Sequence, residues 1–299
     1  MPLERLLAGL PPLLAFAEPL AARLAGISVP ALYADAGQWS TQVRAASRLL
    51  GLKTAAFGGS PCIALEAAGG AVDWATLDTQ PANLADTKPS LRSTARWAAF
   101  IETLERSQAD RSGGAIVACI PGPARLCSLL SGSLEDAVLA RLKEVLVQMA
   151  EAVCHKRPDL LLLDEGDVLC SAPPPAAYRR SIGTLRNVTR YFDVPLGLAV
   201  SGDAASIDAA VLVQPQALIV KAKADGSLPL PNVIASAAAA VDLIGVPVNL
   251  QDGADTRARL ASARNDLPRA NWLLMNVGEL PAQTNIESLH RLVADLGAA

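Results

Sequence analysis

The chain has 299 residues, of which 51% are hydrophobic and 18% are charged, and its formal net charge is −3. Proteins that bind nucleic acid usually carry a surplus of basic residues, which this chain lacks, so nucleic acid is not an expected partner. The sequence contains no run of eighteen apolar residues, so no membrane span is predicted. The length fits one large α/β barrel or two smaller domains.

The N-terminal segment is apolar, but charged residues and prolines interrupt it. Glu4, Arg5 and Glu18 argue against a signal peptide, and we expect a helical extension over residues 1–45 that offers an apolar docking surface. The five cysteines form no CxxC pair, which is typical of reduced thiols. With no export signal, the expected location is cytoplasmic.

Seven short apolar runs alternate with amphipathic segments along the rest of the chain. The predicted strands are Leu52–Phe57, Ala115–Ile120, Leu160–Leu163, Pro195–Val200, Ala217–Val220, Val246–Leu250 and Trp272–Met275. The predicted helices are Leu134–His155, Tyr178–Phe192, Val233–Leu243, Asp255–Arg264 and Ile286–Leu296. Such alternation predicts a parallel sheet covered by helices.

We therefore expect a single α/β domain over residues 1–299, a (β/α)8 TIM barrel of regular or distorted shape. Its eighth strand is the least obvious, and Ala31–Tyr33 is a candidate. Residues 78–110 break the alternation and are interpreted as an insertion near the barrel mouth. A doubly wound open sheet is the alternative, although no GxGxxG loop follows the first predicted strand.

Pro158–Gly166 reads PDLLLLDEG and is the most informative segment. Its four leucines predict a strand buried on both faces, and Asp164 and Glu165 stand where that strand emerges. Side chains alternate along a strand, so only one of the two carboxylates should face the interior. The other interpretation is that either acid caps the next helix or pairs with an arginine.

In a barrel, the residues that follow each strand share one rim, where substrates bind. We expect a small-molecule site there, with Asp164, Glu165 and Asp203 as acid–base catalysts. The expected substrate-binding residues are Ser60, Arg125, Ser201, Lys221, Asn249 and Asn276. Neither of the two histidines, His155 and His290, follows a strand, so no metal site and no catalytic triad are predicted.

The order of several segments resembles the uroporphyrinogen decarboxylase superfamily, which also contains cobalamin- and coenzyme M-linked methyltransferases. The segments that carry the resemblance are LGLKTAAFGGSPCIALEAAGGAVDW (50–74), IPGPARLCSLLSG (120–132), RPDLLLLDEGDVLCSAPPPAAYRRSI (157–182), VPLGLAVSGDAASID (194–208) and NWLLMNVGELPAQTNIESLHRLV (271–293). Together they imply the (β/α)8 barrel of this superfamily over most of the chain, and a homodimer by analogy with such barrels.

The sequence departs from both branches of the superfamily. The resemblance places Ala199, Ser201 and Gly278 where the methyltransferases hold zinc, and Gly59 or Ser60 near the aspartate of the decarboxylases. Three functions stay open: a zinc-independent methyl or other one-carbon transferase, a decarboxylase of a tetrapyrrole or other polycarboxylate, and a non-catalytic partner subunit. In the first, the enzyme acts either alone or with a corrinoid that a partner protein supplies, and no cofactor of its own is predicted.

Overall fold

The computed structural model describes residues 2–7, 13–80, 90–111, 114–169, 173–223, 225, 227–248, 258, 272–280 and 282–298. Eight strands form one parallel sheet in the order β1-β10-β9-β8-β7-β6-β5-β2. Their bounds are β1 Leu13–Phe16, β2 Thr54–Phe57, β5 Ala115–Pro121, β6 Leu160–Gly166, β7 Leu196–Val200, β8 Ala217–Val220, β9 Leu243–Val248 and β10 Trp272–Glu279.

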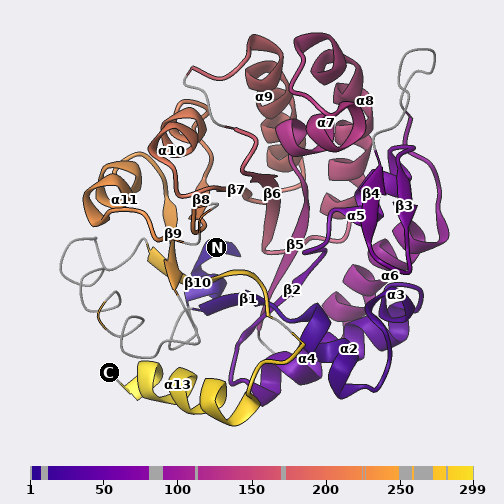
Figure 1. The fold of residues 1–299 in the computed structure, drawn as a ribbon, viewed down its shortest axis with the longest axis vertical. Coiled ribbons are helices and arrows are strands. Elements are labelled where there is room, and N and C mark those ends of the chain that lie inside the picture. Colours follow the sequence, from indigo (N-terminus) through magenta and orange to yellow (C-terminus); the bar gives the residue numbers. More distant parts are fainter. Residues whose placement is uncertain are drawn as a thin grey trace.

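The sheet curls until its two edge strands, β1 and β2, lie next to each other, with the helices outside (Figure 1). The helices are α1 Pro2–Leu7, α2 Glu18–Leu24, α3 Val29–Leu32, α4 Ala36–Leu49, α5 Cys62–Ala67, α6 Ala95–Ala109, α7 Pro123–Ser131, α8 Asp136–Cys154, α9 Ala176–Tyr191, α10 Ala204–Val211, α11 Pro231–Ala238 and α13 Ile286–Ala298. This α/β arrangement confirms the expected TIM-barrel-like fold. Among the described residues, no helix is long and apolar enough to cross a membrane.

All seven predicted strands are present, but the position of the eighth was wrong. It is β1, inside the segment expected to be a helical extension, whereas Ala31 belongs to the short helix α3. The strand is four residues long and buried throughout, so nothing distinguishes LLAF from an apolar helical turn in the sequence. The predicted helix Val233–Leu243 is shorter in the structure, where α11 ends at Ala238 and Leu243 is the first residue of β9. The predicted helix Asp255–Arg264 lies outside the described residues, apart from Ala258.

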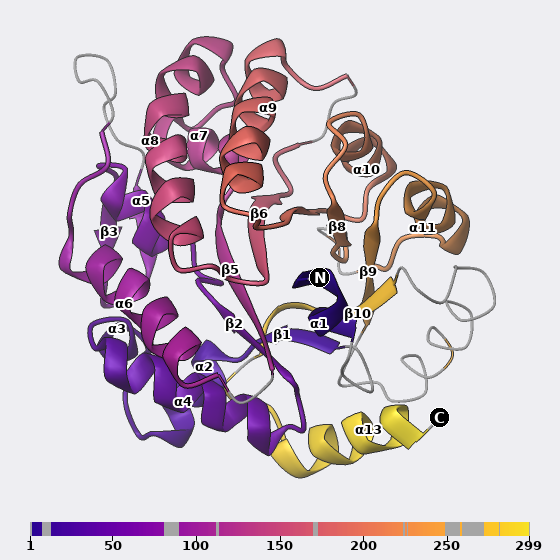
Figure 2. The same cartoon turned by 180° about the vertical axis from the view of Figure 1, so that it is seen from behind.

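Two apolar clusters show which side of each strand faces the barrel interior. The inner cluster includes Leu160 and Leu162 of β6, whereas Leu161 and Leu163 belong to the larger cluster beneath the helices. The N-terminal helix α1 contributes Leu6 to the inner cluster, and α1 packs against β5 and β10 (Figure 2). The apolar N-terminal segment, expected to offer a docking surface, therefore covers the lower end of its own barrel.

Replacing Leu6 by alanine is expected to lower the free energy of unfolding by about 2–4 kcal/mol, because a fully buried leucine leaves a cavity. Leu212→Ala is the matched control, since Leu212 is 57% exposed and its truncation should cost little. Urea unfolding of both variants measures the difference. Equal losses of unfolding free energy in the two variants would show that α1 does not seal the barrel.

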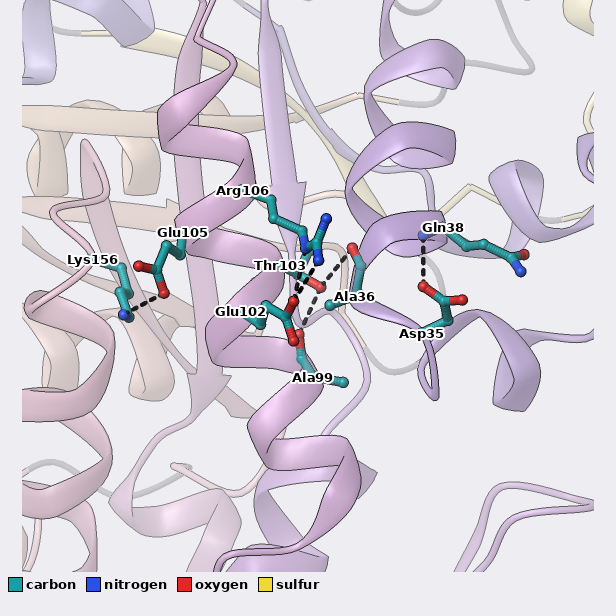
Figure 3. A network of polar contacts seen from close by, with 9 residues as sticks. All are labelled: Asp35, Ala36, Gln38, Ala99, Glu102, Thr103, Glu105, Arg106 and Lys156. Carbon is teal, nitrogen blue, oxygen red and sulfur yellow. Dashed lines mark hydrogen bonds and ion pairs between the residues drawn. The ribbon is translucent and has the colours of Figure 1, made fainter.

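The segment 78–110 contains the hairpin strand β4 Asp78–Gln80, which pairs antiparallel with β3 Ala71–Asp73, and the helix α6. Helix α6 packs against α4 and β5 as part of the outer layer. Thr103 of α6 donates to the carbonyls of Ala99 and Ala36, and the latter contact joins α6 to the start of α4 (Figure 3). On the same helix, Glu105 pairs with Lys156 beyond the end of α8.

Candidate functional site at the barrel mouth

A cavity of about 500 Å³ opens at the carboxyl ends of the strands. Its lining comes from β1, β5, β6, β7, helix α7, the β3–β4 hairpin and the segments that follow β2 and β8. The residues are Phe16, Gly59, Ser60, Pro61, Cys62, Leu77, Thr79, Cys119, Arg125, Leu129, Leu162, Asp164, Ala199 and Lys221. This volume suits a small organic ligand.

Asp164 is the central charged group of this cavity. Because Leu160 and Leu162 point inward, Asp164 two residues further along β6 does so as well. Its carboxylate forms ion pairs with both the Arg125 guanidinium and the Lys221 ammonium. The side chain of Asp164 is 9% exposed, and those of its two partners are 25% and 20% exposed.

Two cations facing one carboxylate leave the cavity wall with a net positive charge. Burial lowers the pKa of Lys221 to about 8, and the positive charge of Arg125 acts in the same direction. A guanidinium carries five N–H donors in a planar fork, and Asp164 contacts the Nη1 nitrogen. The arrangement therefore favours a small anionic ligand that contacts Arg125 and Lys221 from the cavity side.

Glu165 points the other way and does not line the cavity. It is fully buried, and its Oε2 accepts hydrogen bonds from the N–H groups of Ala124 and Arg125 at 2.9 and 3.2 Å. These N–H groups belong to the first turn of α7, so Glu165 caps that helix from the neighbouring strand. The other interpretation expected one of the two acids to cap the next helix, whereas Glu165 caps α7, which precedes β6 in the chain. Its expected role as an acid–base catalyst stays a prediction.

The capping position shifts the ionisation of Glu165. Burial raises its pKa from 4.5 to about 7, although the backbone of Arg125 and Ala124 and the Tyr178 hydroxyl counteract the rise. The folded protein therefore binds this proton more tightly than the unfolded chain does. Its contribution to stability is complete below the unfolded pKa and is lost as the pH rises through the folded pKa.

Glu165→Gln is expected to remove this pH dependence, because glutamine fills the same space without a titrating group. Between about pH 5 and pH 8, the parent protein should lose up to about 3 kcal/mol of unfolding free energy relative to the variant. Urea unfolding of both proteins across this range measures the effect. Parallel stability curves would contradict the raised pKa.

A second buried carboxylate, Glu18, joins the two edges of the curled sheet. It follows β1, and its oxygens accept from the N–H groups of Gly58 and Gly59 after β2 at 2.8 and 3.0 Å. Trp39 Nε1 donates to it as well, at 3.1 Å. Among the described residues, no backbone hydrogen bonds pair β1 with β2, and we call this junction beside the cavity the seam. The Glu18 side chain supplies hydrogen bonds across it.

Sequence reasoning missed two groups at this site, Glu18 and Cys119. Cys119 is 4% exposed and lies on the inner face of β5, in register with Leu162 of β6. Its thiol faces the cavity that holds Asp164, and neither Cys119 nor Cys62 forms a disulfide among the described residues. The strand pattern does not reveal this orientation, because every residue of β5 is buried and either face of the strand could be the inner one.

The other predicted site residues divide into three groups. Ser60, Arg125 and Lys221 line the cavity together with Asp164. Asp203 is exposed at the start of α10 and accepts a hydrogen bond from Ser201 at 2.7 Å, and neither residue lines the cavity. Asn276 lies in β10, in register with Val248, and Asn249 lies outside the described residues.

The residues of this chain do not fit the zinc site that the sequence resemblance to the methyltransferases implies. Ala199 lines the cavity where the resemblance places a zinc ligand, and a methyl side chain offers no donor atom. Within the described ranges, no group of three or more His, Cys, Asp or Glu side chains could hold a metal ion. The described lining of the cavity offers charged side chains and the thiols of Cys62 and Cys119.

Comparisons with known proteins place the fold but not the family. The structure is similar to a methyltransferase from Methanosarcina mazei, with a TM-score of 0.73, 12% identity and coverage of 95% of this chain and 91% of that one. It is also similar to a B12-independent methionine synthase from a Shewanella species, with a TM-score of 0.46 and 10% identity over 67% of this chain and 65% of that one. No protein-family profile and no curated protein sequence matches the chain.

Proposed function

We propose that this protein is a uroporphyrinogen decarboxylase-like barrel enzyme that transfers a methyl or other one-carbon group without zinc. The observation that carries the proposal is the Asp164–Arg125–Lys221 cluster in the cavity at the barrel mouth. A substrate bound there would lie at the rim where barrels of this fold perform chemistry. The likeness to a methyltransferase over nearly the full length of both chains supports the reaction class.

The proposed acceptor is a small anionic molecule, which the cluster selects by charge. Arg125 and Lys221 would bind the anionic group, and Asp164 would keep the two cations in place despite their mutual repulsion. The apolar walls, among them Phe16 and Leu162, would exclude water from the reacting atoms. In the transfer, the acceptor would first lose its proton to water. Its lone pair would then form a bond to the methyl carbon, and the electron pair of the bond from that carbon to the donor would stay with the departing donor.

The proposed donor is a methylated corrinoid that a partner protein carries. The cavity has a volume of about 500 Å³, which suits the acceptor rather than a corrin ring, so the donor would approach from the open mouth. Asp164, Ser60, Arg125 and Lys221 would act at this face. Asp203 and Ser201 lie near the same rim without lining the cavity, and Asn249 and Asn276 stay predicted binding residues.

Incubation with methylcobalamin or a methylated corrinoid protein, together with a panel of small anionic thiols, tests the proposal. Transfer should change the cobalt absorption spectrum and produce the methylated thiol, which mass spectrometry identifies. Arg125→Gln should raise the KM for the acceptor about tenfold, whereas the matched control Arg179→Gln alters an exposed arginine outside the cavity. An unchanged cobalt spectrum with every acceptor would contradict the proposal and favour a non-catalytic partner role.

Decarboxylation of a polycarboxylate is the second candidate, because the cations that suit an anionic thiol also suit a carboxylate. Two cations, one of which must also balance Asp164, are few for a tetrapyrrole with several carboxylates. A fluorescence titration with porphyrinogens separates the two functions. Tight porphyrinogen binding that Arg125→Gln abolishes would favour the decarboxylase, and no binding would exclude the tetrapyrrole substrate.

A further inference from the structure

A second cavity, of about 400 Å³, lies at the opposite end of the barrel from the candidate active site. It is lined by the starts of β2 and β5, the C-terminal half of α4 and the end of α6. The lining residues are Arg44, Ser47, Arg48, Leu52, Lys53, Thr54, Ala55, Ser107, Arg111, Gly114, Ala115 and Ile116. We call it the basal cavity.

Among the residues that the structure describes, the lining of the basal cavity contains four cationic side chains and no acidic one. Arg44 contacts the exposed Asp110, Arg111 contacts the buried Asp159, and both of these acids lie outside the lining. Arg48 and Lys53 are exposed at the opening. The described lining residues themselves therefore carry a net positive charge.

Hydroxyl groups supply neutral donors in the same lining. Ser47 is 3% exposed, and its Oγ has no hydrogen-bond partner in the part of the chain that the structure describes. Ser107 is also buried, and its Oγ contacts Ser40 at 2.9 Å. A buried hydroxyl without a partner costs free energy unless a ligand or water satisfies it. Ser47 thus marks a polar position that a bound group would complete.

The narrow floor of the basal cavity depends on a glycine. Gly114 approaches the backbone of Lys53 so closely that a Cβ at this position would lie 2.4 Å from the Lys53 carbonyl oxygen. The N–H of Ala115 donates to the same carbonyl at 3.0 Å, which aligns the start of β5 with β2. The strand starts thereby form a fixed base between the side chains of α4 and Arg111.

We propose that the basal cavity binds a small oxyanion of the phosphate type, either inorganic phosphate or the phosphate group of a small monoester. Arginine guanidinium groups match the tetrahedral oxygens of phosphate, and a lysine and a serine hydroxyl add donors. No aromatic side chain is present among the described lining residues, so none of them would stack on a nucleobase. The proposed ligand class is therefore a phosphate without a base.

Isothermal titration of the full chain with inorganic phosphate, at constant ionic strength, tests this site. We expect Arg48→Gln and Lys53→Gln each to raise the dissociation constant about tenfold. Both side chains are exposed, so these variants should remain folded. Ser47→Ala should also weaken binding, although it leaves the net charge unchanged. A parallel titration with glycerol 3-phosphate shows whether the free ion or the monoester binds more tightly.

Two controls separate the basal cavity from the candidate active site and from general charge effects. Arg125→Gln removes a cation from the barrel mouth and should leave phosphate binding intact. Arg190→Gln removes an exposed arginine from the end of α9 and should also have no effect. Phosphate binding that Arg125→Gln abolishes, or that Arg190→Gln weakens as much as Arg48→Gln does, would overturn the assignment. The absence of any binding would overturn it too.

Discussion

Asp164→Asn is expected to lower the rate of one-carbon transfer by about 100-fold or more while the protein still folds. The substitution removes the only negative charge from the described lining of the mouth cavity and leaves Arg125 and Lys221 facing each other. Their mutual repulsion should move both side chains from the positions that bind the acceptor. Breaking this partly buried ion pair should also destabilise the fold, by about 3 kcal/mol or less, because all three side chains keep some contact with water.

Two further variants show whether the lost activity follows from the lost charge. Asp164→Asn combined with Lys221→Met restores charge balance in the cavity, so stability should recover whereas transfer should not. Asp208→Asn is the matched control, since Asp208 is exposed on α10 outside the cavity and should tolerate the change. Steady-state kinetics and urea unfolding of the three variants give both readouts. Full transfer activity in Asp164→Asn would exclude this carboxylate from the site.

Glu18→Ala is expected to have the largest effect on stability, a loss of about 3–5 kcal/mol. Three N–H donors, from Trp39, Gly58 and Gly59, would lose their acceptor inside the protein. The turn after β2 carries Ser60 into the mouth cavity, so a loosened seam should also raise the KM for the acceptor. The cost is higher than for an ordinary surface glutamate because the carboxylate is fully buried.

Hydrogen exchange of the Gly58 and Gly59 amides measures the local part of this effect, and urea unfolding measures the whole. Glu151→Ala on the exposed face of α8 is the matched control and should leave both readouts unchanged. Glu18→Gln retains one acceptor oxygen and should give an intermediate stability. Exchange rates that Glu18→Ala leaves unaltered would show that the seam is held by other contacts.

The sequence predicts most of the barrel because its strands are short, apolar and separated by helices of regular period. The run Leu160–Leu163 is recognisable since β6 is buried on both faces. Strand β1 is not recognisable in the sequence, because its four apolar residues show neither the alternation of a half-buried strand nor the spacing of a helix. The eighth strand was therefore assigned to the wrong residues, and only the ladder of β1 with β10 reveals the pairing.

The candidate site was predictable where strand alternation and strand ends decide it. Asp164, Arg125, Lys221 and Ser60 share one cavity because each follows or ends a parallel strand. The position of Glu165 was open, since either carboxylate of the pair could have faced inward. Glu18 and Cys119 were missed because contacts across the seam and between β5 and β6 depend on neighbours far away in the sequence.

The central claim is that a small anionic acceptor binds in the mouth cavity beside Asp164. A crystal structure of the protein with the acceptor that supports transfer tests this claim most directly. We predict that the anionic group lies within hydrogen-bond distance of Arg125 and Lys221, with the reacting atom facing the open mouth. An acceptor bound elsewhere, or a mouth without ligand at a saturating concentration, would contradict the account.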